Sequence, residues 1–164
     1  MSKKFLIALV LTVLVISIVF FGYSISRPSV NVGVDELLSA PEQIEIENRQ
    51  YILESYLSRD FMPISPPDGK PLIALVTITA ADSLEFPSSI NADKLWVIKN
   101  PEEIWETAFT NEKLTPNYNY QLEKIARDGP KWGPNIQVDV VVRITHEGNT
   151  YLLKASNQTI HRTD

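Results

Sequence analysis

The chain has 164 residues, which leaves room for one globular domain and an appendage. Apolar residues make up 44% and charged residues 21%, values typical of folded proteins. Three of the 15 basic residues precede Pro28 and all 20 acidic residues follow it, so residues 28–164 carry 12 basic and 20 acidic side chains, a net charge of −8. An acidic domain has no electrostatic attraction to phosphate backbones, which argues against nucleic acid as a partner. The chain contains no Cys, which excludes disulfides, zinc–thiolate sites and cysteine nucleophiles.

An uncharged apolar segment occupies the N-terminus. Lys3 and Lys4 precede a run over residues 5–21 that contains no charge. A helix over residues 5–23 would be about 28 Å long, close to the thickness of the hydrocarbon core of a bilayer. The sequence therefore predicts a transmembrane helix there, with the membrane as a partner. Because basic residues are concentrated before this helix, we expect the N-terminus in the cytoplasm and the rest of the chain outside.

Two interpretations of residues 1–26 remain open. The first is a retained signal anchor, which makes the chain a single-pass membrane protein. The second is a signal peptide cleaved after Ser24 or Ser26, where small residues match a cleavage site, and this would release a secreted domain. We favour the retained anchor because the apolar core of a signal peptide is usually about 7–15 residues long and this run is longer.

Residues 27–43 are expected to form a tether, followed by an extracytoplasmic domain over residues 44–164. The segment RPSVNVG at residues 27–33 mixes Pro, Ser, Asn and Gly, a composition typical of a linker. Residues 34–38 fit one helical turn, since acidic side chains stand near its N-terminal dipole.

Alternation of apolar residues predicts a series of short strands. The run LIALVTITA is apolar on both faces, as in a buried strand. The clearest hairpin has its turn at residues 146–149. A Gly/Pro-rich loop is expected at residues 126–135. The predicted strands cover residues 72–80, 94–99, 118–122, 136–145 and 150–155.

Two segments fit both a strand and a helix. In residues 50–62, apolar side chains match alternating spacing and i, i+4 spacing, and the aromatic and β-branched content favours a strand. In residues 100–110, the sequence Asn-Pro-Glu-Glu is either a helix start or a hairpin turn. We favour the hairpin because the neighbouring segments are strands.

These segments predict an all-β fold. The expected architecture is an immunoglobulin- or fibronectin-like antiparallel β-sandwich of about six or seven strands, preceded by one N-terminal transmembrane helix. The resemblance is to an architecture rather than to a family, because the Cys…Trp…Cys spacing of antibody domains is absent. Trp96, on a middle strand, fits the buried position that such folds give to Trp.

The sequence predicts no catalytic residue, no cofactor and no metal site. His146 and His161 are the only histidines, and both are expected to be exposed, one in a turn and one near the C-terminus. No G-x-S-x-G elbow, EF-hand or phosphate-binding loop is present. The carboxylate pairs at 35–36, 45/47 and 102–103 lack a third converging ligand, so we expect them on the solvated surface.

Aromatic residues in loops form the candidate recognition surface. Exposed Trp and Tyr on loops stiffened by Pro and Gly bury a large area at small entropic cost when a partner binds. The alternative is that each ring covers the open edge of the core. The candidates are Trp132, Tyr118, Tyr120 and Trp105.

Two classes of function follow. The favoured one is a membrane-tethered, extracytoplasmic, non-enzymatic module that binds a protein or an envelope component, or has a structural role there, through loops and sheet edges. The alternative is an extracytoplasmic hydrolase-like enzyme that uses His146 or His161 with carboxylates. A compact pocket with a buried His–carboxylate pair would favour the enzyme, whereas exposed aromatic residues on a surface without a pocket would favour the binding module.

Overall fold

The computed structural model describes residues 32–164, and Val32–Asp164 form one compact unit. The transmembrane helix expected at residues 5–23 and the first part of the expected tether lie outside the described residues. Among residues 32–164, no helix is both long enough and apolar enough to cross a membrane.

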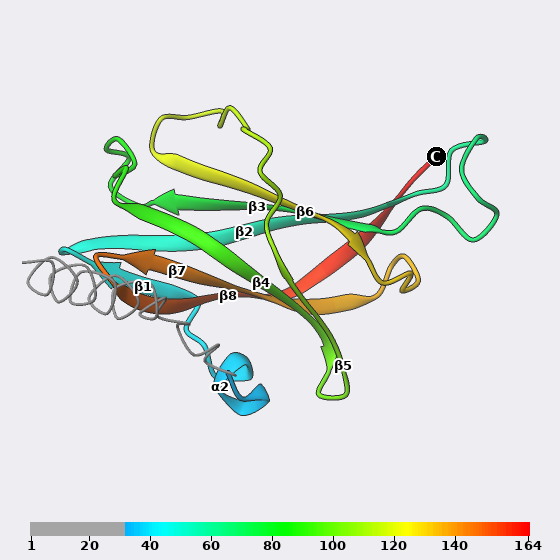
Figure 1. The fold of residues 1–164 in the computed structure, drawn as a ribbon, viewed down its shortest axis with the longest axis horizontal. Helices are drawn as coiled ribbons and strands as arrows, with labels where there is room; N and C mark the ends of the chain where they lie inside the picture. The colour runs from blue at the N-terminus through cyan, green and yellow to red at the C-terminus, as the bar shows by residue number, and fades with distance from the viewer. Residues whose placement is uncertain (1–31) are drawn as a thin grey trace, which may run out of the picture. The chain divides into compact units, whose positions relative to one another are not determined.

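Apart from one short helix, the regular structure of the described residues consists of strands (Figure 1), which confirms the all-β prediction. Both ambiguous segments contain strands: residues 50–60 lie in the second strand, and residues 100–103 form a hairpin turn. In chain order, the elements are α2 (Val34–Leu38), β1 (Gln43–Ile46), β2 (Arg49–Asp60), β3 (Leu72–Ala80), β4 (Ile90–Asn100), β5 (Glu103–Ala108), β6 (Gln121–Gly129), β7 (Gln137–His146) and β8 (Asn149–Thr163).

The strand predicted at residues 118–122 is wrongly placed. β6 begins at Gln121 and continues to Gly129, through residues predicted as a loop. It continues because β3 supplies a pairing partner as far as Gly129, opposite Leu72. The strand β1 was missing from the prediction, since four residues are too few to display a clear alternation.

The strands follow one hydrogen-bonded path in the order β5-β4-β7-β8-β2-β3-β6, and β1 pairs with β2 beside this path. Neighbouring strands are antiparallel except β2 and β8, which pair in parallel over residues 57–60 and 160–163. The expectation of a purely antiparallel arrangement is therefore wrong at this pair. β8 contains a β-bulge at Asn157, whose φ is 55°, and its pairing with β7 resumes at Gln158 and Thr159 before the parallel segment begins at Ile160.

The path curls so that side chains from β2, β3, β4, β7 and β8 enclose one core. The ends of the path approach each other, because Trp105 of β5 packs on Gly129 of β6 and the Thr110 N–H donates to the Ile125 carbonyl at 2.9 Å. Only glycine fits at position 129, where a Cβ would lie 2.7 Å from the Trp105 ring. Completely buried core residues include Leu57, Ile78, Leu95, Val142, Leu153 and Ile160.

A second apolar cluster lies under α2, on the opposite face of β4 and β7. Leu37 of α2 packs there with Trp96 and Val141. Trp96 is buried as expected, but it contacts α2 rather than the core inside the curl. The segment after α2 is bound to β8, since the Lys154 N–H donates to the Pro41 carbonyl at 2.8 Å. Residues 34–41, which the sequence analysis assigns to the tether, thus pack on the domain.

The contact between Trp105 and Gly129 predicts that a methyl group added at position 129 destabilises the fold. We expect Gly129→Ala to lower the free energy of unfolding by about 1–3 kcal/mol, because the new Cβ overlaps the indole ring and forces β5 away from β6. Urea denaturation of the purified protein measures this change. Gly133→Ala is the matched control, since nothing lies within 4 Å of its Cβ position, and its effect should stay within about 0.5 kcal/mol. Equal effects of the two substitutions would contradict the proposed packing.

Candidate functional site

A groove of about 610 Å³ lies between the loop before β4 and the loop before β6. Its walls combine aromatic and proline rings, and its rim carries amides, hydroxyl groups and a carboxylate. Such a lining is typical of recognition sites, because apolar rings supply contact area and a few polar groups orient the ligand. The residues that define the groove include Phe86, Pro87, Pro116, Tyr118, Asn119 and Leu122.

Arg49, at the start of β2, holds the loop that forms one wall of the groove. Its Nε and Nη2 donate to the two carboxylate oxygens of Asp82 at 2.6 and 2.9 Å. The same guanidinium donates to the carbonyls of Leu84 and Glu85 at 3.0 and 3.2 Å. The hydrogen bond from Arg49 lowers the pKa of Asp82 to about 2, so this ion pair is intact at neutral pH.

Backbone hydrogen bonds join the two loops that enclose the groove. The Phe86 N–H donates to the Asn119 carbonyl at 2.9 Å, and the Ala80 N–H donates to the Tyr120 carbonyl at 3.0 Å. Phe86 also meets the buried ring of Tyr51 edge-on, with ring centroids 5.6 Å apart. The groove is therefore preformed, and ligand binding requires little further ordering of its backbone, which keeps the entropic cost of binding small.

Tyr118 and Tyr120, two of the four candidate recognition residues, lie together at this groove. Their rings are stacked, with centroids 5.0 Å apart and an interplanar angle of 12°. Tyr120 is half-buried and packs against the core, whereas Tyr118 is 56% exposed and lines the groove. Tyr120 thus supports the ring that Tyr118 presents to solvent.

Trp105 and Trp132, the other two candidates, lie elsewhere. Both are half-buried and pack against the core, as the alternative interpretation of each ring expects. Trp105 and Tyr120 lie at opposite ends of β3. Trp105 packs on Gly129, which pairs with Leu72, the first residue of β3, whereas the Tyr120 carbonyl accepts a hydrogen bond from Ala80, the last residue of β3. These two ends of β3 are eight residues, or about 26 Å, apart. The structure therefore does not bring the four aromatic residues into one surface.

The loop that carries Trp132 is held by Arg59 of β2, whose side chain is buried with only 3% of the residue exposed. Its guanidinium donates to the carbonyls of Lys70, Lys131 and Trp132 at 3.0, 3.1 and 2.7 Å, and also to the carbonyl of Asp68. These bonds satisfy a charged group that would otherwise be costly to bury. The sequence does not reveal this role, because the acceptors are backbone atoms of distant loops.

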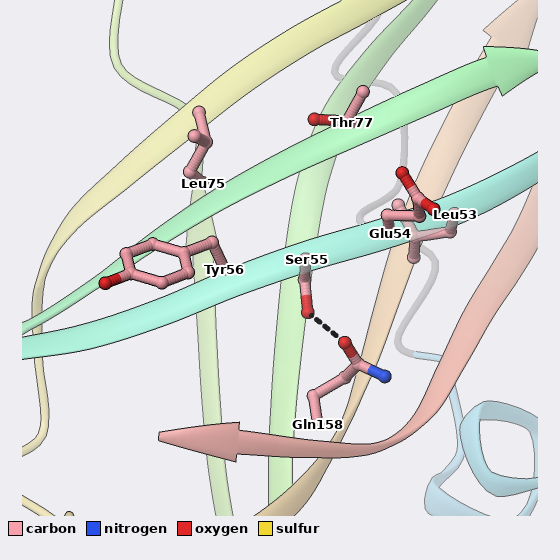
Figure 2. Close-up of a pocket in the computed structure, with 7 residues that line it drawn as sticks. All are labelled: Leu53, Glu54, Ser55, Tyr56, Leu75, Thr77 and Gln158. Carbon is pink, nitrogen blue, oxygen red and sulfur yellow. Dashed lines mark hydrogen bonds between the residues drawn. The ribbon is translucent and has the colours of Figure 1, made fainter. Parts of the chain in front are cut away.

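A second opening, of about 540 Å³, lies along β2 between its pairing with β1 and its pairing with β8 (Figure 2). The Ser55 hydroxyl of β2 donates to Gln158 Oε1 of β8 at 3.0 Å, and this hydrogen bond connects β2 to β8. Tyr56, which also lines this opening, stacks on His161 with ring centroids 5.1 Å apart. His161 is exposed as expected, and its ring takes part in this stacking contact.

His146, the last residue of β7, is buried with 5% of its surface exposed, so the expectation of an exposed turn residue is wrong. The inward alternation of β7, which includes Val142 and Ile144, continues by one more step to His146. That alternation is visible in the sequence and was a signal for burial. The Nε2 atom lies 3.3 Å from Glu47 Oε1, and the buried Nδ1 atom has no hydrogen-bond partner within residues 32–164.

Two hairpin turns meet beside His146. Glu47 and Asn48 join β1 to β2 with φ angles of 53° and 60°, and Glu147 and Gly148 join β7 to β8 with φ angles of 48° and 84°. Positive φ at both central residues is characteristic of type I′ turns, which match the twist of the strands they connect. One imidazole nitrogen and one oxygen of each glutamate all lie within 4.8 Å of one another. We call these three residues the hairpin-turn cluster.

Comparisons of the chain with protein-family models, with curated proteins and with solved structures find no match. The candidate site is therefore assigned from its own geometry. Phe86 and Arg49, which build the groove, were not among the candidates of the sequence analysis. The prolines at 87 and 116 indicated loops, but nothing in the local sequence indicated that these two loops meet.

The ion pair between Arg49 and Asp82 predicts a pH-dependent contribution to stability. Because the folded-state pKa of Asp82 is about 2, below its ordinary value of 3.8, the pair stabilises the fold above pH of about 4 and loses this effect as the pH falls toward 2. We expect Asp82→Asn to lower the melting temperature at pH 7, with a difference from the wild type that shrinks over this acid range.

Thermal melts of both proteins between pH 2 and 7 test this expectation. Asp128→Asn is the control, because Asp128 is exposed and its positive φ suits Asn equally well. A difference between the wild type and Asp82→Asn that is independent of pH would show that Asp82 acts through its shape rather than its charge.

Proposed function

We propose that the chain is a membrane-tethered, extracytoplasmic binding module that recognises a protein or an envelope component through the groove at Tyr118. The observation that carries this proposal is a preformed groove with an exposed tyrosine ring, fixed from below by Tyr120. Aromatic side chains held in place by a rigid scaffold are effective contact residues, since they have few rotatable bonds and lose little conformational entropy on binding. In this proposal the chain binds its partner and catalyses no reaction.

In the same proposal the domain belongs to the immunoglobulin- or fibronectin-like class of sandwiches. Support comes from the curled sheet, in which β4 and β7 share one core with β2 and β3. Folds of this class present binding residues on the loops at one end. The groove fits that pattern, because it is formed by the loops before β4 and β6.

A hydrolase-like enzyme is the second candidate, and the contact of the buried His146 with the exposed carboxylate of Glu47 favours it. A carboxylate beside an imidazole orients the ring and stabilises its charged form, as a general base requires. Neither the groove at Tyr118 nor the opening along β2 is lined by His146, however, so substrate in these hollows would not reach the imidazole. The binding module is therefore the better supported function.

Membrane tethering by a retained signal anchor predicts that residues 1–26 are still present in the mature protein. If residues 1–26 remain as a signal anchor, mass spectrometry of the mature protein from membranes should find the N-terminal segment, and protease added to intact cells or spheroplasts should remove the domain. A mature protein that starts at Ile25 or Arg27 would instead show cleavage. Degradation only after spheroplasts are lysed would place the domain on the cytoplasmic side.

The groove predicts that Tyr118 carries much of the binding energy. Tyr118→Ala should weaken the complex by about 2 kcal/mol, roughly thirtyfold in Kd, while it changes the stability of the domain by less than about 1 kcal/mol. Tyr56→Ala is the matched control, because Tyr56 is also an exposed tyrosine, at 48%, and is also stacked on one aromatic neighbour.

The experiment uses the full chain in detergent as bait and the solubilised envelope of the same cells as the probe. Components retained by the wild type are identified, and their affinities for the wild type and for the two variants are compared. The proposal requires that the wild type and Tyr56→Ala bind alike and that Tyr118→Ala binds more weakly. Retention of no component by the wild type, or equal affinity of all three proteins, would refute it.

A further inference from the structure

The hairpin-turn cluster, made of Glu47, His146 and Glu147, has the donor atoms of a cation site. Its three ligand atoms come from two different turns and lie within 4.8 Å of one another. The shortest of these contacts joins His146 Nε2 and Glu47 Oε1, at 3.3 Å. Donor atoms that converge in this way from separate hairpins can surround one small ion.

The imidazole of His146 makes this cluster different from a group of surface carboxylates. The residue is 95% buried, its Nδ1 has no hydrogen-bond partner within the described part of the chain, and its Nε2 faces Glu47. The Nε2 atom, which faces Glu47, is the nitrogen that a cation in the cluster would bind, and Nδ1 would then carry the ring proton. A buried imidazole that presents one nitrogen to two carboxylates is a donor arrangement that a cation would complete.

The charges around the cluster also favour a cation. Glu47 and Glu147 bring two carboxylates to one place, and like charges at this separation repel each other unless a positive group lies between them. Arg49 attracts Glu47 electrostatically, but its guanidinium donates hydrogen bonds to both carboxylate oxygens of Asp82 and not to the cluster. The side chain of Glu47 is 59% exposed, so an ion can reach the cluster from solvent.

The donor set selects the class of ion. Calcium and magnesium prefer oxygen ligands throughout, whereas zinc and related transition metals readily combine imidazole nitrogen with carboxylate oxygen. Three protein ligands leave at least one position of a tetrahedral zinc ion for water. We propose that Glu47, His146 and Glu147 bind a divalent transition-metal cation, for which Zn²⁺ is the probe.

Such an ion would connect the β1–β2 turn to the β7–β8 turn. These turns are far apart in the sequence, so the ion would stabilise the folded state in which they meet. The effect reaches the groove, because His146 pairs with Ile90 and Ile90 lines the groove. The inference goes beyond the proposed binding function and does not depend on it.

The test is calorimetric titration of Zn²⁺ into the full chain in detergent, after removal of metals with a chelator. We expect one saturable equivalent per chain. Glu47→Gln and Glu147→Gln should each weaken binding by at least about tenfold, and the double variant should abolish it. Glu45→Gln is the matched control, because Glu45 is an exposed glutamate on the same hairpin that does not belong to the cluster, and its affinity should equal that of the wild type.

A second measurement separates this site from chance binding at the exposed His161. Zn²⁺ should raise the melting temperature of the wild type, Glu45→Gln and His161→Gln, but not that of Glu47→Gln. No saturable binding, binding that is lost only in His161→Gln, or equal affinity of all variants would overturn the proposal. Preference for Ca²⁺ over Zn²⁺ would overturn the assigned class of ion. Melts without metal show whether the carboxylate variants still fold, as exposed substitutions should.

Discussion

The change of partner along β8 is the constraint on which the rest of the fold depends. The first part of this strand pairs antiparallel with β7, and its last four residues pair in parallel with β2. Before this change, the pairing with β7 is interrupted at Asn157, which adopts a left-handed conformation that Asn tolerates and donates its N–H to Asp139 Oδ1 at 2.9 Å. The register of β7 and β8 shifts at the same place, as in a β-bulge. The pairing with β7 resumes after the bulge and continues to Thr159, so β8 connects β7 to β2.

The bend of β8 opens a space beside β2, and two features of functional interest depend on it. β1 pairs with β2 in that space, which carries the turn at Glu47 to the turn at Glu147 and creates the hairpin-turn cluster. Where β1 ends and the parallel pairing has not begun, Ser55 and Gln158 bridge the remaining gap. The groove at Tyr118 is formed by the loops before β4 and β6, which bond to each other. Recognition and ion binding are therefore proposed for neighbouring but separate places.

Strands with a clear alternation were predictable, and those without one were not. β3 matches its predicted range because both of its faces are apolar, a property of the local sequence. β6 was misplaced because its final residues, including Gly129, are held by pairing with β3 rather than by their own propensity. The burial of His146 could have been predicted by extending the alternation of β7 by one step, but its assignment to the turn at residues 146–149 suggested exposure.

Taken alone, the sequence determined the all-β class, the acidic charge of the domain, the hairpin of β7 and β8, and the burial of Trp96, because each of these follows from composition or from periodicity over a few residues. Only the tertiary structure decided which distant residues meet. The pairing of Arg49 with Asp82, the separation of the tyrosines from the tryptophans, and the approach of Glu47 to His146 all depend on strand order and on the bend of β8. Strand order is set by contacts between segments far apart in the chain, and no local pattern records them.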